Sequence, residues 1–290
     1  MGPFSGPVDR SAVVRRIAAT DLGKTPEEMR ADFARLILGD DPPAVPAGVA
    51  VEQGERGLIL RPAGTAAGCP VVWFHGGGYV FGSPETHLRA AAELCRHARR
   101  DVHLPRYRLA PEHPWPAQRD DALAAVSALG DPVVLAGDSA GGHLALVAAL
   151  RLARAGAPPA GLVLFSPNTD RSGRNAERAM MSNVDPMVDD ADDRRLFEMC
   201  FGTDYDPEDP EVSPLLDDLS LLPPTWVEVG LPEVLRGDSV ALQHAARCRG
   251  GSIDLTITPG LVHMGQLWAP GWVEANASLA RAAAFLRRLP

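Results

Sequence analysis

Short apolar runs typical of β-strands alternate with helix-like stretches along most of this chain, and this alternation constrains the fold more than any other feature. Strands that alternate with helices build a largely parallel sheet with helices on both faces. Strands are predicted at residues 57–60, 71–74, 102–104, 133–136, 162–165, 226–229 and, with weaker alternation, 253–258. Helices are predicted at residues 85–99, 118–129, 142–155, 189–200, 238–249 and 273–288. The pattern predicts an α/β fold with a mostly parallel central sheet.

The residues ahead of this sheet have a different pattern. Two amphipathic helices are expected at residues 10–20 and 26–38, and a Pro-rich linker follows at residues 41–48. We therefore expect residues 1–46 to form a small helical N-terminal cap and residues 47–290 to form the main domain. Residues 168–218 hold Pro and Asp clusters around one helix and form a possible additional cap segment.

Charge and hydropathy exclude several kinds of partner. The chain has 290 residues, 46% of them hydrophobic, which is enough for a sizeable core in one large domain. Lys and Arg number 28 against 37 Asp and Glu, so no basic surface is expected for nucleic acid or an anionic membrane. The longest apolar helical run, residues 144–150, is far shorter than the roughly 20 residues that span a bilayer.

The N-terminus and the cysteines predict the compartment. Residues 1–10 carry no basic patch followed by an apolar core, which favours a cytoplasmic protein over a secreted one. The four cysteines, Cys69, Cys95, Cys200 and Cys248, are not paired in spacing. Buried reduced thiols fit them better than disulfides or a zinc site.

One glycine-rich turn is a candidate for nucleophilic catalysis. The strand at residues 133–136 runs directly into the segment GDSAGG, residues 137–142, and a helix follows at once. A sharp turn from strand to helix lifts a serine Oγ above the sheet, and only small neighbours tolerate the crowding. Without this context a bare GxSxG pattern would fit an ordinary glycine-rich turn equally well. The strand before it and the helix after it favour Ser139 as a nucleophile.

A second glycine run is a candidate for binding the oxyanion that forms when a carbonyl is attacked. It consists of Gly76, Gly77 and Gly78 and directly follows the strand at residues 71–74. Glycines let backbone N–H groups face a cleft with no Cβ in the way. Two of these three N–H groups, together with that of Ala140, would form an oxyanion hole. The alternatives are a flexible turn or a phosphate-binding loop, and the latter would require a lysine that does not follow here.

Three motifs together resemble the bacterial hormone-sensitive-lipase-like esterases. They are HGGGYVFGSPETH at residues 75–87, YRLAPEHPWPA at residues 107–117 and GDSAGG at residues 137–142, in the order of that family. The likeness continues through residues 182–187, 213–230 and 259–263, so it covers almost everything after about residue 50. It is strongest toward the intracellular acetyl hydrolases and lactone hydrolases. It implies an α/β-hydrolase fold with about eight strands and a Ser–acid–His triad in that chain order.

His263 is the best candidate for the base. It follows the last predicted strand and a Pro-Gly turn, so it would lie on a loop at the carboxyl edge of the sheet, where ligands bind in such folds. The segment PGLVH at residues 259–263 also resembles the family. We expect His75 to brace the glycine loop. The remaining histidines are expected to have structural roles, in predicted helices or in the APEHPW segment.

The resemblance implies Glu233 as the acid. The family usually carries Asp in a G-x-x-D-P-L-R-D-E pattern, and the chain reads GLPEVLRGD at residues 230–238, with Glu233 on the acid position. A Glu can orient an imidazole as an Asp does. The alternative is Asp238, which would otherwise cap the following helix.

The APEHPW segment is expected to form a rigid turn that supports the glycine loop, with Arg108 and Glu112 as buried or half-buried braces. Ser139 comes 23 residues after Pro116 in the sequence, which is about ten fewer than the resemblance implies, so we expect an element there to be trimmed.

Taken together, these residues predict a serine hydrolase that cleaves carboxylic esters of small acyl groups through an acyl-enzyme, without a cofactor or a metal. A first alternative is an N-acetyl amide or lactone hydrolase in a biosynthetic pathway. A second alternative is a non-catalytic small-molecule-binding protein on the same fold, against which the intact Ser139, His263 and glycines argue. The resemblance also allows a homodimer.

Overall fold

A central sheet of eight strands organises the structure, a computed structural model that describes residues 8–39, 45–130 and 132–290. The order is β1-β2-β4-β3-β5-β6-β7-β8; β2 is antiparallel to β1 and β4, and every other pair is parallel. The strands are β1 (Val49–Gly54), β2 (Gly57–Pro62), β3 (Val71–Phe74), β4 (Val102–Pro105), β5 (Val134–Asp138), β6 (Gly161–Phe165), β7 (Thr225–Gly230) and β8 (Ile253–Thr258). The predicted mostly parallel sheet is confirmed.

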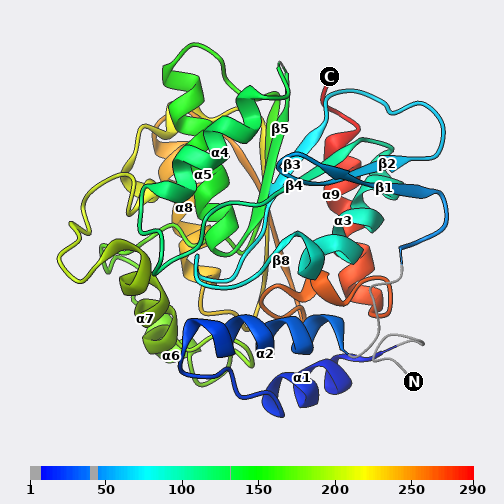
Figure 1. The fold of residues 1–290 in the computed structure, drawn as a ribbon. Helices are drawn as coiled ribbons and strands as arrows, with labels where there is room; N and C mark the ends of the chain where they lie inside the picture. The colour runs from blue at the N-terminus through cyan, green and yellow to red at the C-terminus, as the bar shows by residue number, and fades with distance from the viewer. Residues whose placement is uncertain (1–7, 40–44, 131) are drawn as a thin grey trace.

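Helices cover both faces of this sheet (Figure 1). On one face lie α3 (Pro84–Ala98) and α9 (Val273–Leu286), which pack against each other. On the other face lie α4 (Ala117–Ser127), α5 (Ala140–Arg154) and α8 (Arg236–Cys248). Because both faces are covered, every residue of β3, β5 and β6 is buried, as is usual for parallel strands.

Four more helices lie at the carboxyl edge of the parallel strands (Figure 1). They are α1 (Arg10–Ala18), α2 (Pro26–Leu38), α6 (Arg178–Met181) and α7 (Asp190–Phe201). Short 3-10 helices occur at Pro214–Leu216, Leu219–Leu221 and Gly265–Trp268. The side chain of Thr25 and that of Glu28 form a capping box, which fixes the start of α2.

One face of α2 is buried and attaches this helix to the main domain. Met29, Phe33, Leu36 and Ile37 are at most 4% exposed, and the Phe33 ring centroid lies 4.8 Å from that of Phe81. The division into a cap of residues 1–46 and a domain of residues 47–290 stays a prediction. Residues 1–7 and part of the expected linker, residues 41–44, lie outside the described residues.

The expectation of four buried thiols is wrong at one position. All four cysteines are free, and Cys69, Cys95 and Cys200 are buried, but Cys248 is exposed. Cys248 is the last residue of α8, and its Sγ lies 3.6 Å from Nε2 of the exposed His244 one helical turn earlier. Both side chains therefore belong to the solvent face of α8. No helix in the described part of the chain is long and apolar enough to cross a membrane.

Candidate active site

Ser139 lies at the turn between β5, which ends at Asp138, and α5, which begins at Ala140. Its φ of 56° and ψ of −122° are unusual for a residue with a side chain, as expected of a strained turn that projects a nucleophile. The glycines around it are required by space. A Cβ on Gly137 would lie 2.1 Å from the Gly141 carbonyl oxygen, and one on Gly141 would lie 2.1 Å from that of Phe74.

The three side chains predicted to form a triad lie in one hydrogen-bonded chain. Ser139 Oγ is 2.9 Å from His263 Nε2, and His263 Nδ1 is 2.9 Å from Glu233 Oε2. The other oxygen of Glu233, Oε1, accepts the Gly230 N–H at 2.5 Å, which fixes the carboxylate at the end of β7. All three side chains are buried. If Nδ1 carries its proton toward Glu233, Nε2 is left free to accept the serine proton.

Carboxylates around the imidazole set its protonation. Burial lowers the pKa of His263, but the hydrogen bond and charge of Glu233, with the charges of Asp185 and Asp193, outweigh burial and raise it. Asp185 is 8% exposed, and burial raises its pKa to about 6. Its Oδ2 accepts the N–H of Val234, next to Glu233, at 2.9 Å. Asp185 therefore positions the acid loop, a role that the sequence did not reveal.

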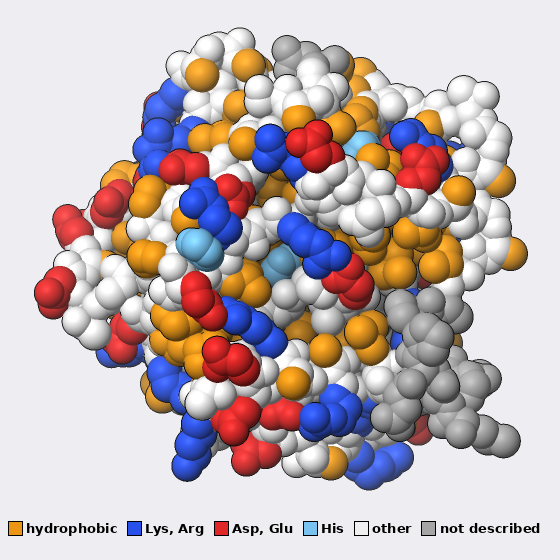
Figure 2. Space-filling view, in the orientation of Figure 1, with side chains coloured by type: hydrophobic (Ala, Val, Ile, Leu, Met, Phe, Trp, Pro, Cys, Tyr) orange, Lys and Arg blue, Asp and Glu red, His pale blue; other side chains and the backbone are white. Residues whose placement is uncertain are grey.

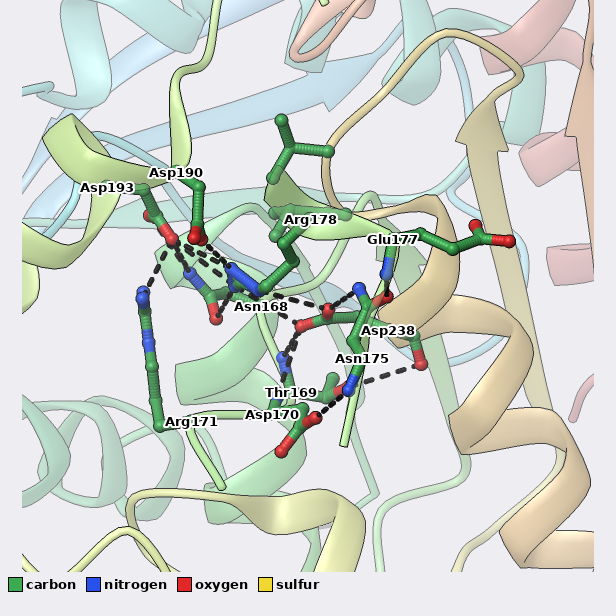
Figure 3. A network of polar contacts seen from close by, with 12 residues as sticks. Asn168, Thr169, Asp170, Arg171, Asn175, Glu177, Arg178, Asp190, Asp193 and Asp238 are labelled. Atoms are coloured by element: carbon green, nitrogen blue, oxygen red, sulfur yellow. Dashed lines mark hydrogen bonds and ion pairs between the residues drawn. The ribbon is translucent and has the colours of Figure 1, made fainter. Parts of the chain in front are cut away.

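Asp238, the alternative acid, does not contact His263. Its carboxylate accepts the backbone N–H of Thr169 at 3.0 Å and that of Asp170 at 3.1 Å, and the side-chain amide of Asn175 at 2.6 Å. It also pairs with Arg178 at 3.4 Å (Figure 3). Asp238 belongs to a buried polar network that ties residues 168–178 to α8, so it is neither the acid partner of His263 nor a cap of its own helix.

The glycine loop presents two of its three glycines to the serine. Gly77 and Gly78 line the same cavity as Ser139 and His263. Gly76 does not line this cavity, and its N–H donates instead to Asp138 Oδ2 at 3.1 Å. The inclusion of Gly76 among the oxyanion donors is therefore corrected. The remaining candidates are the N–H groups of Gly77, Gly78 and Ala140, and the last lies in the first turn of α5, where N–H groups have no intrahelical acceptor.

Asp138, the residue before the nucleophile, holds the glycine loop in place. Besides the Gly76 N–H, its carboxylate accepts the indole N–H of Trp73 at 2.7 Å and contacts His87 Nε2 at 3.1 Å. Burial opposes its ionisation, but His87 and Trp73 outweigh burial and hold the pKa of Asp138 below its usual value. Its place inside the GDSAGG motif was the available signal for this role.

The two residues predicted to brace the APEHPW segment from inside, Arg108 and Glu112, do not do so. Arg108 and Glu112 are exposed: Arg108 pairs with Asp121 and Glu112 pairs with Arg30 on α2, so both form surface ion pairs. The buried brace is Tyr107, whose hydroxyl donates to the His75 carbonyl oxygen at 2.6 Å. The physical reason is that long charged side chains keep their heads in water, whereas a tyrosine buries its ring.

A cavity of about 280 Å³ opens above the serine. Its apolar walls come mainly from α1 and α2, and residues 186–196 close the other side. Asp189, Asp192 and Arg195 line this side, and Asp192 pairs with Arg195 at 3.5 Å. On the face seen in Figure 2, acidic and basic side chains lie interspersed without a broad patch of one sign. Among the described residues, no group of three or more His, Cys, Asp or Glu is arranged to hold a metal ion.

Comparison with known proteins agrees with this fold. Residues 71–267 match the family model described as alpha/beta hydrolase fold. An acetyl-hydrolase from Streptomyces hygroscopicus is 38% identical over 236 residues, which cover 79% of this chain and 78% of that protein. The carboxylic ester hydrolase LipN from Mycobacterium tuberculosis is 32% identical over 251 residues, which cover 79% of this chain and 66% of that protein.

A solved structure of an esterase from the bacterial hormone-sensitive lipase family superposes with a TM-score of 0.88 at 32% identity, covering 96% of this chain and 97% of that one. The fold and the serine–histidine pair define an α/β-hydrolase. The chain belongs to the α/β-hydrolase family, in the branch of the bacterial hormone-sensitive-lipase-like esterases, and is a serine ester hydrolase.

Proposed function

We propose that this enzyme is a carboxylesterase-type hydrolase of small-acyl carboxylic esters, with Ser139 as nucleophile, His263 as general base and Glu233 as the acid that orients it. The observation that carries the proposal is the 2.9 Å contact between Ser139 Oγ and His263 Nε2, continued by the 2.9 Å contact to Glu233. Nucleophile, base and orienting group within hydrogen-bond reach are the signature of covalent acyl transfer.

In the proposed mechanism, Ser139 Oγ attacks the ester carbonyl while His263 Nε2 takes its proton. The negative charge that develops on the carbonyl oxygen is stabilised by the N–H groups of Ala140 and of Gly77 or Gly78. The imidazolium then gives its proton to the departing alcohol, which leaves an acyl group on Ser139. A water molecule, deprotonated by His263, attacks this acyl-enzyme and releases the acid.

The direct test is the Ser139→Ala variant, assayed on p-nitrophenyl acetate. We expect hydrolysis to fall by about 1,000-fold or more, because the covalent step is lost. Ser252→Ala, at an exposed serine between α8 and β8, is the matched control and should keep wild-type activity. A fluorophosphonate probe should label the wild type and not Ser139→Ala. Full activity of Ser139→Ala would overturn the proposal.

A second candidate is hydrolysis of N-acetyl amides. The observation that favours it is the 38% identity to a protein named acetyl-hydrolase. Amides have poorer leaving groups than esters, so the same site would have to protonate the leaving nitrogen efficiently. Acetanilides, lactones and acetate esters assayed side by side decide between the candidates, since an amide or lactone hydrolase would cleave its own substrates faster than the acetate esters.

We also propose a cytoplasmic location and leave the homodimer as a prediction. The location is supported by the four free thiols, three of them buried. Sedimentation or light scattering of the purified chain would measure the oligomeric state.

A further inference from the structure

The proposed oxyanion hole is divided between two segments that are far apart in the sequence. One half is the glycine loop after β3, with the N–H groups of Gly77 and Gly78, and the other half is the start of α5, with the N–H of Ala140. Hydrogen-bond donors stabilise an oxyanion only at a separation of about 2.7–3.1 Å. The distance between the two halves must therefore be held closely.

A direct side-chain contact joins the two halves. Tyr79 comes directly after Gly78, and its Oη lies 2.6 Å from Nδ1 of His143. His143 lies in the first turn of α5, where its N–H donates to the Ser139 carbonyl oxygen at 3.0 Å. The contact therefore connects the residue next to one oxyanion donor with the helical turn that carries the other.

This contact is shielded from water and carries no charge. Tyr79 is 1% exposed and His143 is 2% exposed. Burial raises the pKa of the Tyr79 hydroxyl well above its usual value and lowers the pKa of His143 to about 4, so both groups are neutral near pH 7. If the bond is removed, a buried polar atom loses its partner and no water is at hand to replace it.

Tyr79 is also held in a strained backbone conformation. Its φ of 67° lies in the left-handed region, which a residue with a side chain rarely adopts and which persists only where the surroundings enforce it. The Tyr79 ring packs edge-on against that of His143, with centroids 5.8 Å apart, and lies 5.9 Å from that of Trp115. Its carbonyl oxygen accepts the Ala110 N–H at 2.9 Å. Ring and backbone contacts together keep this end of the glycine loop in place.

The two halves face each other across a small gap beside the large cavity above the serine. The gap has a volume of about 10 Å³, and Gly78, Tyr79, Ala140 and His143 all line it. A space of this size is about that of one water molecule. Because Tyr79 and His143 form part of its wall, a change in this pair changes the space between Gly78 and Ala140.

We propose that Tyr79 and His143 are positioning residues that set the separation between the two halves of the oxyanion hole. Neither side chain lines the large cavity above the serine, so they act through the N–H groups of Gly78 and Ala140 and not by touching the substrate. The inference rests on the proposed ester hydrolysis. It goes beyond that function because it gives two residues outside the triad a part in transition-state stabilisation.

The first experiment removes the Tyr79 hydroxyl. Tyr79→Phe keeps the ring and loses one oxygen atom, and p-nitrophenyl acetate is the substrate. We expect kcat to fall about 10- to 100-fold with KM within about twofold of the wild-type value, because a displaced donor weakens binding of the transition state and not of the substrate. Tyr205→Phe, the same change at a half-buried tyrosine that packs on Phe197, is the matched control and should keep both values.

A second substrate separates a loosened oxyanion hole from general damage. In the thiono analogue of p-nitrophenyl acetate, sulfur replaces the carbonyl oxygen, and sulfur is a weaker hydrogen-bond acceptor than oxygen. An intact hole therefore favours the oxygen ester, and a loosened hole loses part of this preference. We expect the ratio of kcat/KM for the oxygen ester to that for the thiono ester to fall about tenfold in Tyr79→Phe. An unchanged ratio or a wild-type kcat overturns the proposal.

The other partner is tested with two variants of His143. His143→Asn keeps a polar atom near the position of Nδ1, whereas His143→Leu removes it. We expect the Asn variant to keep the wild-type kcat and ratio and the Leu variant to reproduce the result for Tyr79→Phe. Equal behaviour of the two His143 variants contradicts the proposal.

Thermal unfolding shows which variants are folded. If Tyr79→Phe does not fold, the two His143 variants decide the proposal, and if His143→Leu does not fold, Tyr79→Phe decides it. Failure of the proposed function would look different, since Ser139→Ala would then keep its activity. Wild-type behaviour of Tyr79→Phe beside an inactive Ser139→Ala rejects this inference alone.

Discussion

Asp185 shows how a single carboxylate outside the triad can tune the base. It accepts the Val234 N–H through Oδ2 and those of Met187 and Val188 through Oδ1. Its charge is one of the causes that raise the pKa of His263. The residue thus links the segment above the site to the loop that carries Glu233, and it stabilises the imidazolium formed during the reaction.

Asp185→Asn should move the acid limb of the pH profile. The proposed mechanism requires neutral His263, so the raised pKa places the acid limb of kcat/KM above pH 6.5 in the wild type. Removing a negative charge makes the imidazolium less stable, which lowers that pKa. We expect a shift of about 0.5 pH unit toward acid, which corresponds to about 0.7 kcal/mol. A limb that stays in place, in a variant with wild-type thermal stability, would contradict this account.

Much of the site was predictable residue by residue, and the exceptions share a cause. Ser139 and His263 follow predicted strands, where the local pattern marks them, whereas Glu233 was expected only from the resemblance to the family, with Asp238 as the alternative. Asp185 could not be predicted, because its partner Val234 is 49 residues away and only tertiary packing brings them together. The engaged N–H of Gly76 was hidden for the same reason, since its acceptor is Asp138 on another strand.

At the scale of elements, α2 is attached to the loop that follows the three glycines. Arg30 Nε donates to the Val80 carbonyl oxygen at 2.9 Å, and Nη2 donates to that of Ala110, also at 2.9 Å. The same guanidinium binds Glu112, and its hydrogen bond lowers the pKa of that carboxyl to about 2. One side chain therefore joins α2, the glycine loop and the APEHPW turn.

Arg30→Ala should loosen this junction. Three acceptors lose their donor, so we expect the free energy of unfolding to fall by about 1–2 kcal/mol and KM for hexyl acetate to rise. Arg35→Ala, on the same helix but 66% exposed and paired within the helix, is the control and should change neither quantity. Urea unfolding and steady-state kinetics measure both. Equal behaviour of the two variants would mean that Arg30 is only a surface residue.

Elements were predictable where burial imposes a periodic pattern. The bounds of β3, α2 and β8 agree with expectation: α2 has apolar residues at helical spacing, and β3 is a short continuous apolar run. Strand β1 was missed, since it lies at the edge of the sheet and most of its residues are exposed, so no alternation marks it. The ends of helices shifted by a few residues because local caps decide them.

At the scale of the whole molecule, two buried histidines predict acid sensitivity. Burial lowers the pKa of His75 to about 3 and that of His143 to about 4, so both are neutral in the folded protein. Below pH 6.5 the unfolded chain binds protons that the folded protein does not, and stability is lost as the pH falls toward these values. Asp185, Asp238 and His263, whose pKa values are raised, act in the opposite direction. The carboxyls of Asp138, Asp193 and Glu112, whose pKa values are lowered, act in the same direction as the two histidines, because stability is lost when they are protonated.

We therefore expect the urea midpoint to fall from pH 7 to pH 4.5, with a total loss of several kcal/mol. His143→Gln should flatten this dependence, because the side chain no longer titrates. His244→Gln, at an exposed position on α8, should leave the slope unchanged. A midpoint that is constant over this range would show that the two buried imidazoles do not govern acid unfolding.

The attachment of α2 has a consequence for anyone who would redesign this enzyme. The helix that lines the large cavity through Met29 and Phe33 also holds, through Arg30, the backbone just beyond the glycines. A change in α2 that alters which substrates fit the cavity is therefore expected to move the glycine loop as well, and so to change the rate of turnover. Libraries that widen the cavity at Met29 or Phe33 should enrich for compensating changes near Val80, so the two segments are best diversified together.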